Sequence, residues 1–363
     1  LIKMIKEKLK LKITKKGKIS FSDYMETILF DKSFGVYENK QVLGEEGHFI
    51  TSPLVSKYFS HCIAKNYIQV LEAEKLYNIV ELGAGNADLA VNLILYLKDK
   101  KCLPKKYYFL DKSAHLISRQ KIAIDNLNIK DSVEFVWTDK YEDLPKEAFV
   151  ISNELFDCIP TDLIRYKDKC YQKAYINEEF KILWEEFDSF SDNTLTALSL
   201  PKKLPDNYVF EFSKGQNTII DRINKIMHKA YFLIFDYGYS ANELYINDRI
   251  EGTLTCIKNH LSDFDPLVDV GEKDISAFVN FSYLKNIFEN YNWATEAFMS
   301  QANYLLSFDI LKDIDINNID ELSSIKKLIM PNQMGEIFKV LIVGKNINET
   351  FNYNFIKNDI IKL

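Results

Sequence analysis

The stretch that most constrains the fold is a glycine turn between an apolar strand and an apolar helix. Residues 77–82 are typical of a buried strand and include Glu81, and Gly83 and Gly85 follow one residue apart. Residues 89–97 are apolar and predict a helix. This order is typical of the first βα unit of a nucleotide-binding parallel sheet. Glycine permits the tight turn and lets a ligand approach the backbone without a Cβ in the way.

The order of the glycines separates two classes of cofactor. A dinucleotide fold has the pattern GxGxxG, which would place its third glycine at position 88, where this chain has Asp88. A carboxylate at that helix N-terminus would repel a pyrophosphate. S-adenosylmethionine (SAM) has no phosphate and carries an ammonium, a carboxylate and a sulfonium. We therefore expect Glu81, Gly83 and Gly85 to bind SAM.

The next two predicted strands also end in polar residues. Residues 107–110 are followed by Asp111, which lies close to the spacing at which an acid meets the ribose hydroxyls in such folds. Either Asp111 or Ser113 could also cap the helix predicted over 114–127, and the two roles are compatible. Residues 133–137 are followed by Thr138 and Asp139, which we expect to contact the adenine.

Two further strands bring acids to the same edge of the sheet. Residues 148–152 precede Asn153, Glu154 and Asp157, and residues 231–235 precede Asp236. Ligands in open α/β sheets bind at this carboxyl edge. If the turn after residue 153 is helical, Glu154 and Asp157 share one face. The alternatives are a helix cap for Asp157 and an ordinary turn residue for Asp236.

These acids suit the methylation of arginine. A guanidinium stays protonated in proteins and is a poor nucleophile, so its enzyme needs carboxylates that hold it and accept a proton. We assign catalysis to Glu154, Asp157 and Asn153. Asp236, Tyr237 and His260 are the candidates for substrate binding, although Tyr237 could equally serve in packing and His260 as a hydrogen-bonded residue of the cap.

One polar loop also bears on the site. Residues 44–53 precede a helix predicted over 55–72, and they are either a connector or a strand that covers the cofactor. In the second case Thr51 and Ser52 would donate hydrogen bonds to SAM.

The rest of the chain divides by pattern into segments around an α/β core. We expect a mostly parallel, Rossmann-like sheet of seven strands, closed by an antiparallel pair over 295–299 and 338–343. Short alternating runs over 160–212 predict an antiparallel β insertion, and 216–228 predicts an amphipathic helix. The predicted segments are a helical N-terminal part with the covering loop (1–75), a SAM-binding core (76–158), the β-rich insertion with its helix (159–230), the rest of the core with a cap at 240–280 (231–348), and a tail (349–363).

Composition excludes several classes of protein. The net charge of −6 argues against general nucleic-acid binding. The exception is Lys3–Lys18, with eight lysines and one glutamate, which we interpret as a solvated helix face, with an anionic partner or a membrane surface as the alternative. Five scattered cysteines show no metal-binding spacing and fit a reducing compartment. No apolar run is long enough to span a bilayer, so we expect no stable membrane insertion.

Ordered motifs along nearly the whole chain carry a family resemblance. They are Ile19-Ser20-Phe21 with Tyr24-Met25, Phe49-Ile50-Thr51-Ser52-Pro53, Val80-Glu81-Leu82-Gly83 with Gly85, Asn153-Glu154 with Phe156-Asp157 and Pro160, Asp236-Tyr237-Gly238-Tyr239, Gly252-Thr253-Leu254 with His260, Asp265-Pro266-Leu267, Gly271-Glu272 with Asp274-Ile275, and Met334-Gly335 with Phe338-Lys339-Val340-Leu341. With these motifs the chain resembles the MidA family of class I SAM-dependent methyltransferases.

The resemblance implies a SAM fold with an insertion and a cap. For the mitochondrial members it implies symmetric dimethylation of an arginine on a respiratory complex I subunit, which would make the partner a protein. It would place the reaction in the bacterial cytoplasm or, for an organellar protein, in the mitochondrial matrix. The alternatives are a non-catalytic assembly factor, or a methyltransferase for RNA or a small molecule. The chain departs from the family at Ala87, His48 and Leu54, where Gly, Asp and Glu are usual.

Overall fold

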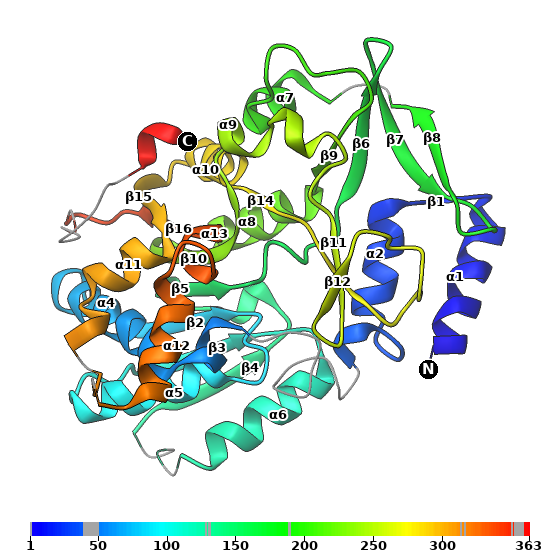
Figure 1. The fold of residues 1–363 in the computed structure, drawn as a ribbon. Coiled ribbons are helices and arrows are strands. Elements are labelled where there is room, and N and C mark those ends of the chain that lie inside the picture. The colour runs from blue at the N-terminus through cyan, green and yellow to red at the C-terminus, as the bar shows by residue number, and fades with distance from the viewer. Residues whose placement is uncertain are drawn as a thin grey trace.

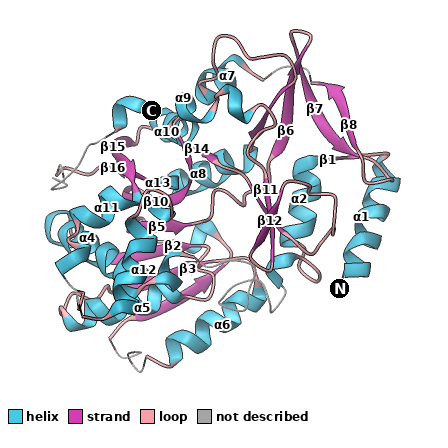
Figure 2. Cartoon of the chain, in the orientation of Figure 1, coloured by secondary structure: helices cyan, strands magenta, loops and turns pink. Residues whose placement is uncertain are grey.

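The computed structural model describes residues 2–38, 51–127, 129, 132–187, 190–312, 314–315, 317–349, 351 and 359–363. Within these ranges there are three sheets, and helices cover both faces of the largest (Figures 1 and 2). The helices are α1 Ile2–Lys16, α2 Phe21–Phe30, α3 Ser52–Val55, α4 Lys57–Glu74, α5 Asp88–Asp99, α6 Ala114–Asp125, α7 Asp192–Leu198, α8 Lys214–Ile226, α9 Ala241–Leu244, α10 Phe281–Asn290, α11 Gln301–Ser307, α12 Ile319–Ile329 and α13 Met334–Ile337. Short 3₁₀ turns include Val36–Glu38 and Tyr141–Asp143.

The main sheet has the strand order β15-β16-β10-β5-β2-β3-β4, with β14 paired to one end of β10. Its strands are β2 Asn78–Leu82, β3 Lys106–Leu110, β4 Glu134–Thr138, β5 Glu147–Asn153, β10 Lys229–Tyr239, β14 Val279–Asn280, β15 Ala294–Ser300 and β16 Phe338–Lys345. The strands from β4 to β10 are parallel neighbours, and β16 runs antiparallel to both β10 and β15. The closing antiparallel pair was therefore predicted correctly.

The expected count of seven strands is wrong, because β14 adds an eighth. Gly238 and Tyr239 pair with Val279 and Asn280 in parallel. Gly238 has φ +153°, and a Cβ there would lie 2.1 Å from the Val279 carbonyl oxygen, so only glycine permits this approach. For the same reason β10 extends to Tyr239, and Asp236 lies inside the strand instead of after it.

The alternating side chains of the main sheet build two cores. One face packs on α4, α5, α11 and α12 through residues such as Ile79, Phe149 and Leu233. The opposite face packs on α8 and α10 through residues such as Val80, Val150 and Phe232. Because both faces are covered, the central strands read as continuous apolar runs in the sequence, and this is why they were predictable.

The second sheet combines the insertion with the N-terminal segment. It contains β1 Ile19–Ser20, β6 Asp162–Lys167, β7 Cys170–Ile176, β8 Ile182–Glu186 and β9 Tyr208–Phe212, all in antiparallel pairs. The antiparallel insertion is thus confirmed. Ser20 caps α2 by accepting a hydrogen bond from the Asp23 N–H.

The segment predicted as a cap over 240–280 carries the third sheet, with β11 Thr255–Lys258, β12 Leu261–Asp263 and β13 Asp274–Ser276. Its apolar residues Cys256 and Ile275 pack with α1, α2 and β7 in a third core. Tyr24 of α2 donates a hydrogen bond to the Pro266 carbonyl oxygen at 2.6 Å. These contacts fix α2 beside the carboxyl edge of the main sheet.

Candidate active site

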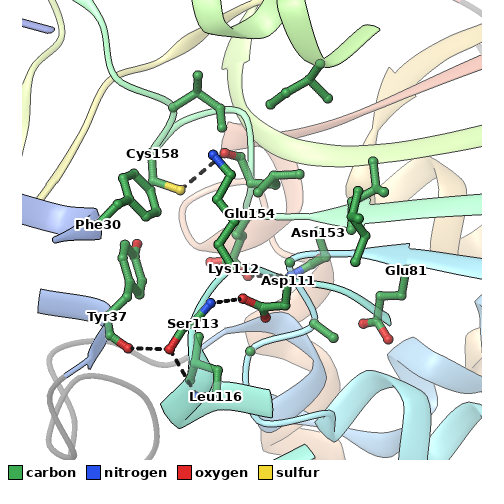
Figure 3. A pocket seen from close by; sticks show the side chains of 18 of the residues that line it. Phe30, Tyr37, Glu81, Asp111, Lys112, Ser113, Leu116, Asn153, Glu154 and Cys158 are labelled. Carbon is green, nitrogen blue, oxygen red and sulfur yellow. Dashed lines mark hydrogen bonds between the residues drawn. The ribbon is translucent and has the colours of Figure 1, made fainter. Parts of the chain in front are cut away.

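A pocket of about 340 Å³ opens at the carboxyl ends of β2, β3 and β5 (Figure 3). We call the part lined by residues 81–86, 88–89, 110–113, Leu116 and Asp139 the cofactor half. We call the part lined by Phe30, Tyr37, residues 153–155 and residues 158–160 the acceptor half. Figure 3 shows Phe30 and Tyr37 on one side and Glu81 on the other, with Asp111, Asn153 and Glu154 between them.

The glycine turn of the cofactor half adopts left-handed backbone angles. Gly83 has φ +67° and Gly85 has φ +53°. A Cβ at Gly83 would lie 2.9 Å from Leu155 Cδ1, so a side chain there would press into the acceptor half. Ala87 also has a left-handed φ, +69°, and precedes α5. This position, where the family usually has glycine, therefore has a backbone that glycine adopts more readily.

Two of the predicted carboxylates of the cofactor half, Glu81 and Asp111, have neutral hydrogen-bond partners. The Tyr107 hydroxyl donates to Glu81 Oε2 at 2.7 Å. Asp111 accepts from the Ser113 N–H at 3.0 Å and from Gln120 Nε2 at 2.8 Å. Burial raises the pKa of Glu81 to about 8 and raises the pKa of Asp111 above its ordinary value. The N-cap of α6 is Ser113, which leaves Asp111 to line the pocket.

The other predicted cofactor residues lie in different places. Asp139 and Thr51 line the pocket, whereas Thr138 is not among the lining residues and donates to Asp143 Oδ2 at 2.6 Å. Ser52 is fully buried, and its hydroxyl donates to Gln301 Oε1 at 3.1 Å, so it does not face the cofactor half. The loop residues before Thr51, His48 among them, lie outside the described residues.

Glu154 is held by donors from three parts of the chain. Its Oε1 accepts from Asn153 Nδ2 at 2.9 Å and from the Ser52 N–H at 3.2 Å, and its Oε2 accepts from the Tyr237 hydroxyl at 3.3 Å. Burial raises its pKa to about 7, although these hydrogen bonds favour the charged form. Its φ of +52° is left-handed, an uncommon angle outside glycine that often marks a functional site.

Three more carboxyl groups gather behind Glu154. Asp157, Asp236 and Asp274 are buried. Burial is the largest cause of their raised pKa values, and the charges of neighbouring carboxylates raise the pKa values of Asp157 and Asp236 further. We call these three with Glu154 the acid cluster. The pKa of Asp236 is raised to about 8 and that of Asp274 to about 6, while that of Asp157 is raised well above its usual range.

The turn after β5 is not helical, so the expectation that Glu154 and Asp157 share a helical face is wrong, and Asp157 is not a helix cap. The reason is Asp236, whose Oδ2 accepts from the N–H groups of Phe156 at 2.7 Å and Leu155 at 3.2 Å. These bonds hold the turn in an irregular path. Glu154 lines the pocket, while Asp157 and Asp236 stand behind it and are not among the lining residues.

The acid cluster has no cationic partner in the described part of the chain. No lysine or arginine there forms an ion pair with any of its four members, and Asp157 Oδ1 has no hydrogen-bond partner. Across those described ranges no group of His, Cys, Asp and Glu is arranged to hold a metal ion. Buried like charges without a counter-ion are costly, so this arrangement suits a cationic organic ligand.

Of the two remaining candidates for substrate binding, Tyr237 lies at the site and His260 does not. Tyr237 contacts Glu154 and packs on Phe338 with ring centroids 4.0 Å apart. His260 is exposed in the turn between β11 and β12 and is not among the pocket-lining residues.

The sequence analysis missed several site residues. Tyr37 lines the pocket and donates to Asp274 Oδ1 at 3.0 Å, and the Cys158 thiol lies beside both. Asp274 stands in one of the quoted motifs, which was its only signal. Tyr37 had none, because its partner is far away in the sequence.

The residues present fit SAM. The cofactor half offers the glycine turn after β2, Asp111 after β3, and Asp139 near the place expected for adenine. Asn153 Oδ1 is buried without a hydrogen-bond partner among the described residues, and Asn153 lines the pocket. It can accept a hydrogen bond from the ammonium of SAM.

Comparison with known proteins agrees with this geometry. The model of a family of S-adenosyl-L-methionine-dependent methyltransferases matches residues 62–299, more than half of the chain. The chain belongs to this family. The resemblance to MidA methyltransferases is thereby confirmed, and the cofactor is SAM.

Individual relatives extend the match. A solved structure from Burkholderia thailandensis, described as a candidate methyl transferase and bound to S-adenosyl-homocysteine, is 25% identical with a TM-score of 0.86, over 96% of this chain and 94% of that one. The mitochondrial protein arginine methyltransferase NDUFAF7 of Homo sapiens is 21% identical over 94% of this chain and 80% of its own length. The NDUFAF7 homologue of Drosophila melanogaster is 24% identical over 78% and 69%. The class I methyltransferase fold is supported by the first of these.

Proposed function

We propose that this methyltransferase acts on a protein arginine and dimethylates it symmetrically, on a subunit of respiratory complex I or a homologue of that subunit. The observation that carries the proposal is the acid cluster, which consists of three buried carboxyl groups and the half-buried Glu154 and has no lysine or arginine partner among the described residues. A guanidinium entering from the pocket would supply the missing positive charge. A neutral or anionic acceptor would leave the carboxylates uncompensated.

The roles within the site follow from which group reaches the pocket. When bound, SAM supplies a methyl group on a sulfonium, which is a good leaving group, so the protein chiefly has to align the acceptor. Glu154 lines the pocket, binds the guanidinium and accepts its proton as the new N–C bond forms. A pKa of about 7 places this group where it can accept a proton near neutral pH.

The other members of the acid cluster act at a distance. Asp236 fixes the turn that carries Glu154 through its hydrogen bonds to two backbone N–H groups. Asp157 and Asp274 lie behind Glu154, and the like charge of Asp274 raises the pKa of both Glu154 and Asp157. A cation in the pocket would favour the charged forms of these carboxyl groups. Asn153 orients Glu154 through its Nδ2 and leaves its Oδ1 for the cofactor.

The identity of the protein substrate rests on the relatives. Those named protein arginine methyltransferases are mitochondrial and match most of this chain. They support a protein acceptor, in the mitochondrial matrix or, for a bacterial protein, in the cytoplasm. No helix in the described residues is long and apolar enough to cross a membrane.

The test mixes the purified protein, methyl-labelled SAM and the candidate complex I subunit. A matched set of the same subunit carries lysine in place of each surface arginine in turn. We expect label in the wild-type subunit and loss of label with one lysine replacement. Label that survives the loss of every arginine would refute the proposal.

Two other outcomes would support the competing functions. Labelling of RNA or a small molecule, but of no protein, would indicate a different acceptor. Tight binding of S-adenosyl-homocysteine without transfer to any acceptor would indicate an assembly factor that keeps the fold and has lost catalysis.

A further inference from the structure

A second hollow lies between α1 and α2, next to the active-site pocket. Its lining includes four lysines and two acids, together with Leu11, Thr27 and Phe30; the charged residues are Lys8, Lys12, Lys15, Lys32, Glu26 and Asp31. Glu26 and Phe30 of α2 line both this hollow and the active-site pocket, so the two hollows are neighbours. In Figure 1 the two helices lie side by side near the N-terminus. We call this hollow the lysine groove.

The groove is basic in a protein that is otherwise acidic. Since Lys3–Lys18 holds eight lysines and one glutamate, the rest of the chain carries a net charge of −13 against −6 for the whole. Lys8 pairs with Asp31, and Lys12 pairs with Asp23. Lys15 and Lys32 form no ion pair with any described residue, which leaves two positive charges for a ligand.

The outer face of α1 mixes these charges with apolar side chains. Its inner face, Ile5, Leu9 and Ile13, is fully buried. Met4 and Leu11 are 50% and 64% exposed, and they lie seven residues apart on the helical face that also bears Lys8 and Lys15. A helix that lies on a membrane needs its broad apolar face free, and here that face is already used.

We propose that the lysine groove binds an acidic segment of the protein substrate, with one or more apolar side chains, that lies next to the target arginine in the substrate chain. This inference rests on the proposed function and deepens it. The charges of such a segment complement both sites: the arginine enters the acid cluster, and the acidic flank lies on Lys15 and Lys32. A segment of the opposite pattern would meet like charge at both places.

The binding test uses a short fluorescent peptide of Glu, Asp and Leu without arginine. The groove variant is Lys15→Glu with Lys32→Glu. The matched control is Lys3→Glu with Lys10→Glu, which makes the same charge change at exposed positions of α1 that do not line the groove. We expect the groove variant to bind roughly tenfold more weakly than the control, with the difference shrinking at high salt.

Equal weakening in both variants would overturn the proposal, and so would equal binding of a Gln, Asn and Leu peptide. Groove-dependent binding of anionic vesicles or single-stranded RNA that exceeds peptide binding would also overturn it. A second measurement uses methyl transfer to arginine peptides with an acidic or a Gln-containing flank. The groove variant should raise KM for the acidic peptide and leave kcat unchanged. If no arginine peptide is methylated, the proposed function fails, while the binding measurement still decides the groove.

Discussion

In the cofactor half of the pocket Glu81 and Asp111 accept hydrogen bonds from a hydroxyl, an amide or a backbone N–H. Three members of the acid cluster have neutral donors of the same kinds, but the cluster also brings four carboxyl groups close together and leaves Asp157 Oδ1 without a hydrogen-bond partner among the described residues. The first arrangement is complete without a ligand charge. The second lacks a cation. The difference indicates that the cofactor half is shaped in advance, while the acceptor half gains most of its electrostatic balance only when the substrate binds.

The largest test of this difference between the two halves of the pocket is a substitution of Glu154. Glu154→Gln keeps the shape and removes the charge, so we expect kcat for methyl transfer to fall by roughly 10²–10⁴, the range for loss of a general base. The affinity for S-adenosyl-homocysteine, measured by calorimetry, should stay unchanged. Asp157→Asn should lower kcat less, because Asp157 does not line the pocket. Full turnover in both variants would show that the cluster is structural.

The reverse result is expected at Asp111. Asp111→Ala removes an acid that lines the cofactor half, and the affinity for S-adenosyl-homocysteine should fall by about 1–3 kcal/mol. Asp111→Asn, which keeps an acceptor for the Ser113 N–H, should lose less. In both variants kcat at saturating SAM should remain near that of the wild type. Unchanged affinity in calorimetry of Asp111→Ala would remove Asp111 from the cofactor site.

The pH dependence sharpens the contrast. The charged form of Glu154 is needed to bind and deprotonate the guanidinium, and its pKa is about 7. We expect kcat/KM for the acceptor to fall about tenfold per pH unit below that value. Tyr237→Phe removes a hydrogen bond that favours the carboxylate, so the pKa should rise and the falling limb should move to higher pH. A limb that does not move would exclude this role of the tyrosine.

The smallest effect concerns stability. The carboxyl groups of the acid cluster have raised pKa values, so between about 4 and about 8 the folded protein binds more protons than the unfolded chain. The free energy of unfolding should therefore fall as pH rises through that window. Asp157→Asn removes one such charge, and we expect its Tm at pH 8 to exceed the wild-type Tm by a few degrees, with little difference at pH 4.

The control for this measurement is Asp248→Asn, which changes an exposed acid. Its Tm should match that of the wild type at both pH values. A lower Tm for Asp157→Asn at pH 8 would mean that the charged carboxylate has a stabilising partner in the free protein.

The sequence predicted the local parts of this site better than the distant ones. The strands of the main sheet, the glycine turn and Asp111 were accessible because each is encoded within a short apolar or glycine-containing stretch. Glu154 was accessible because it follows such a strand. The path of its turn was not, because Asp236, about 80 residues away, fixes it through backbone hydrogen bonds.

Contacts across long sequence separations explain the other errors. Tyr37 meets Asp274 at a separation of 237 residues, and no local pattern marks either as a partner. Ser52 was a candidate to donate to SAM if its loop covers the cofactor. Its hydroxyl instead donates to Gln301, 249 residues later, and its N–H donates to Glu154. The eighth strand, β14, depends on the close approach of Val279 to Gly238. It has only two residues, too few for their strand propensity to predict it.

The pairing of β1 with β7 has a consequence for the order of folding. Ile19 lies opposite Ile176, so the N-terminal strand has to wait during synthesis until β7 has left the ribosome. The strands β2 to β5, which carry the cofactor half, lie together between residues 78 and 153 and can pair earlier. Contacts between residues far apart in the sequence form slowly, because the chain loses the entropy of closing a long loop before the contacts can compensate for that loss. The newly made chain should therefore acquire its SAM-binding strands before the wall with Phe30 and Tyr37 closes over them.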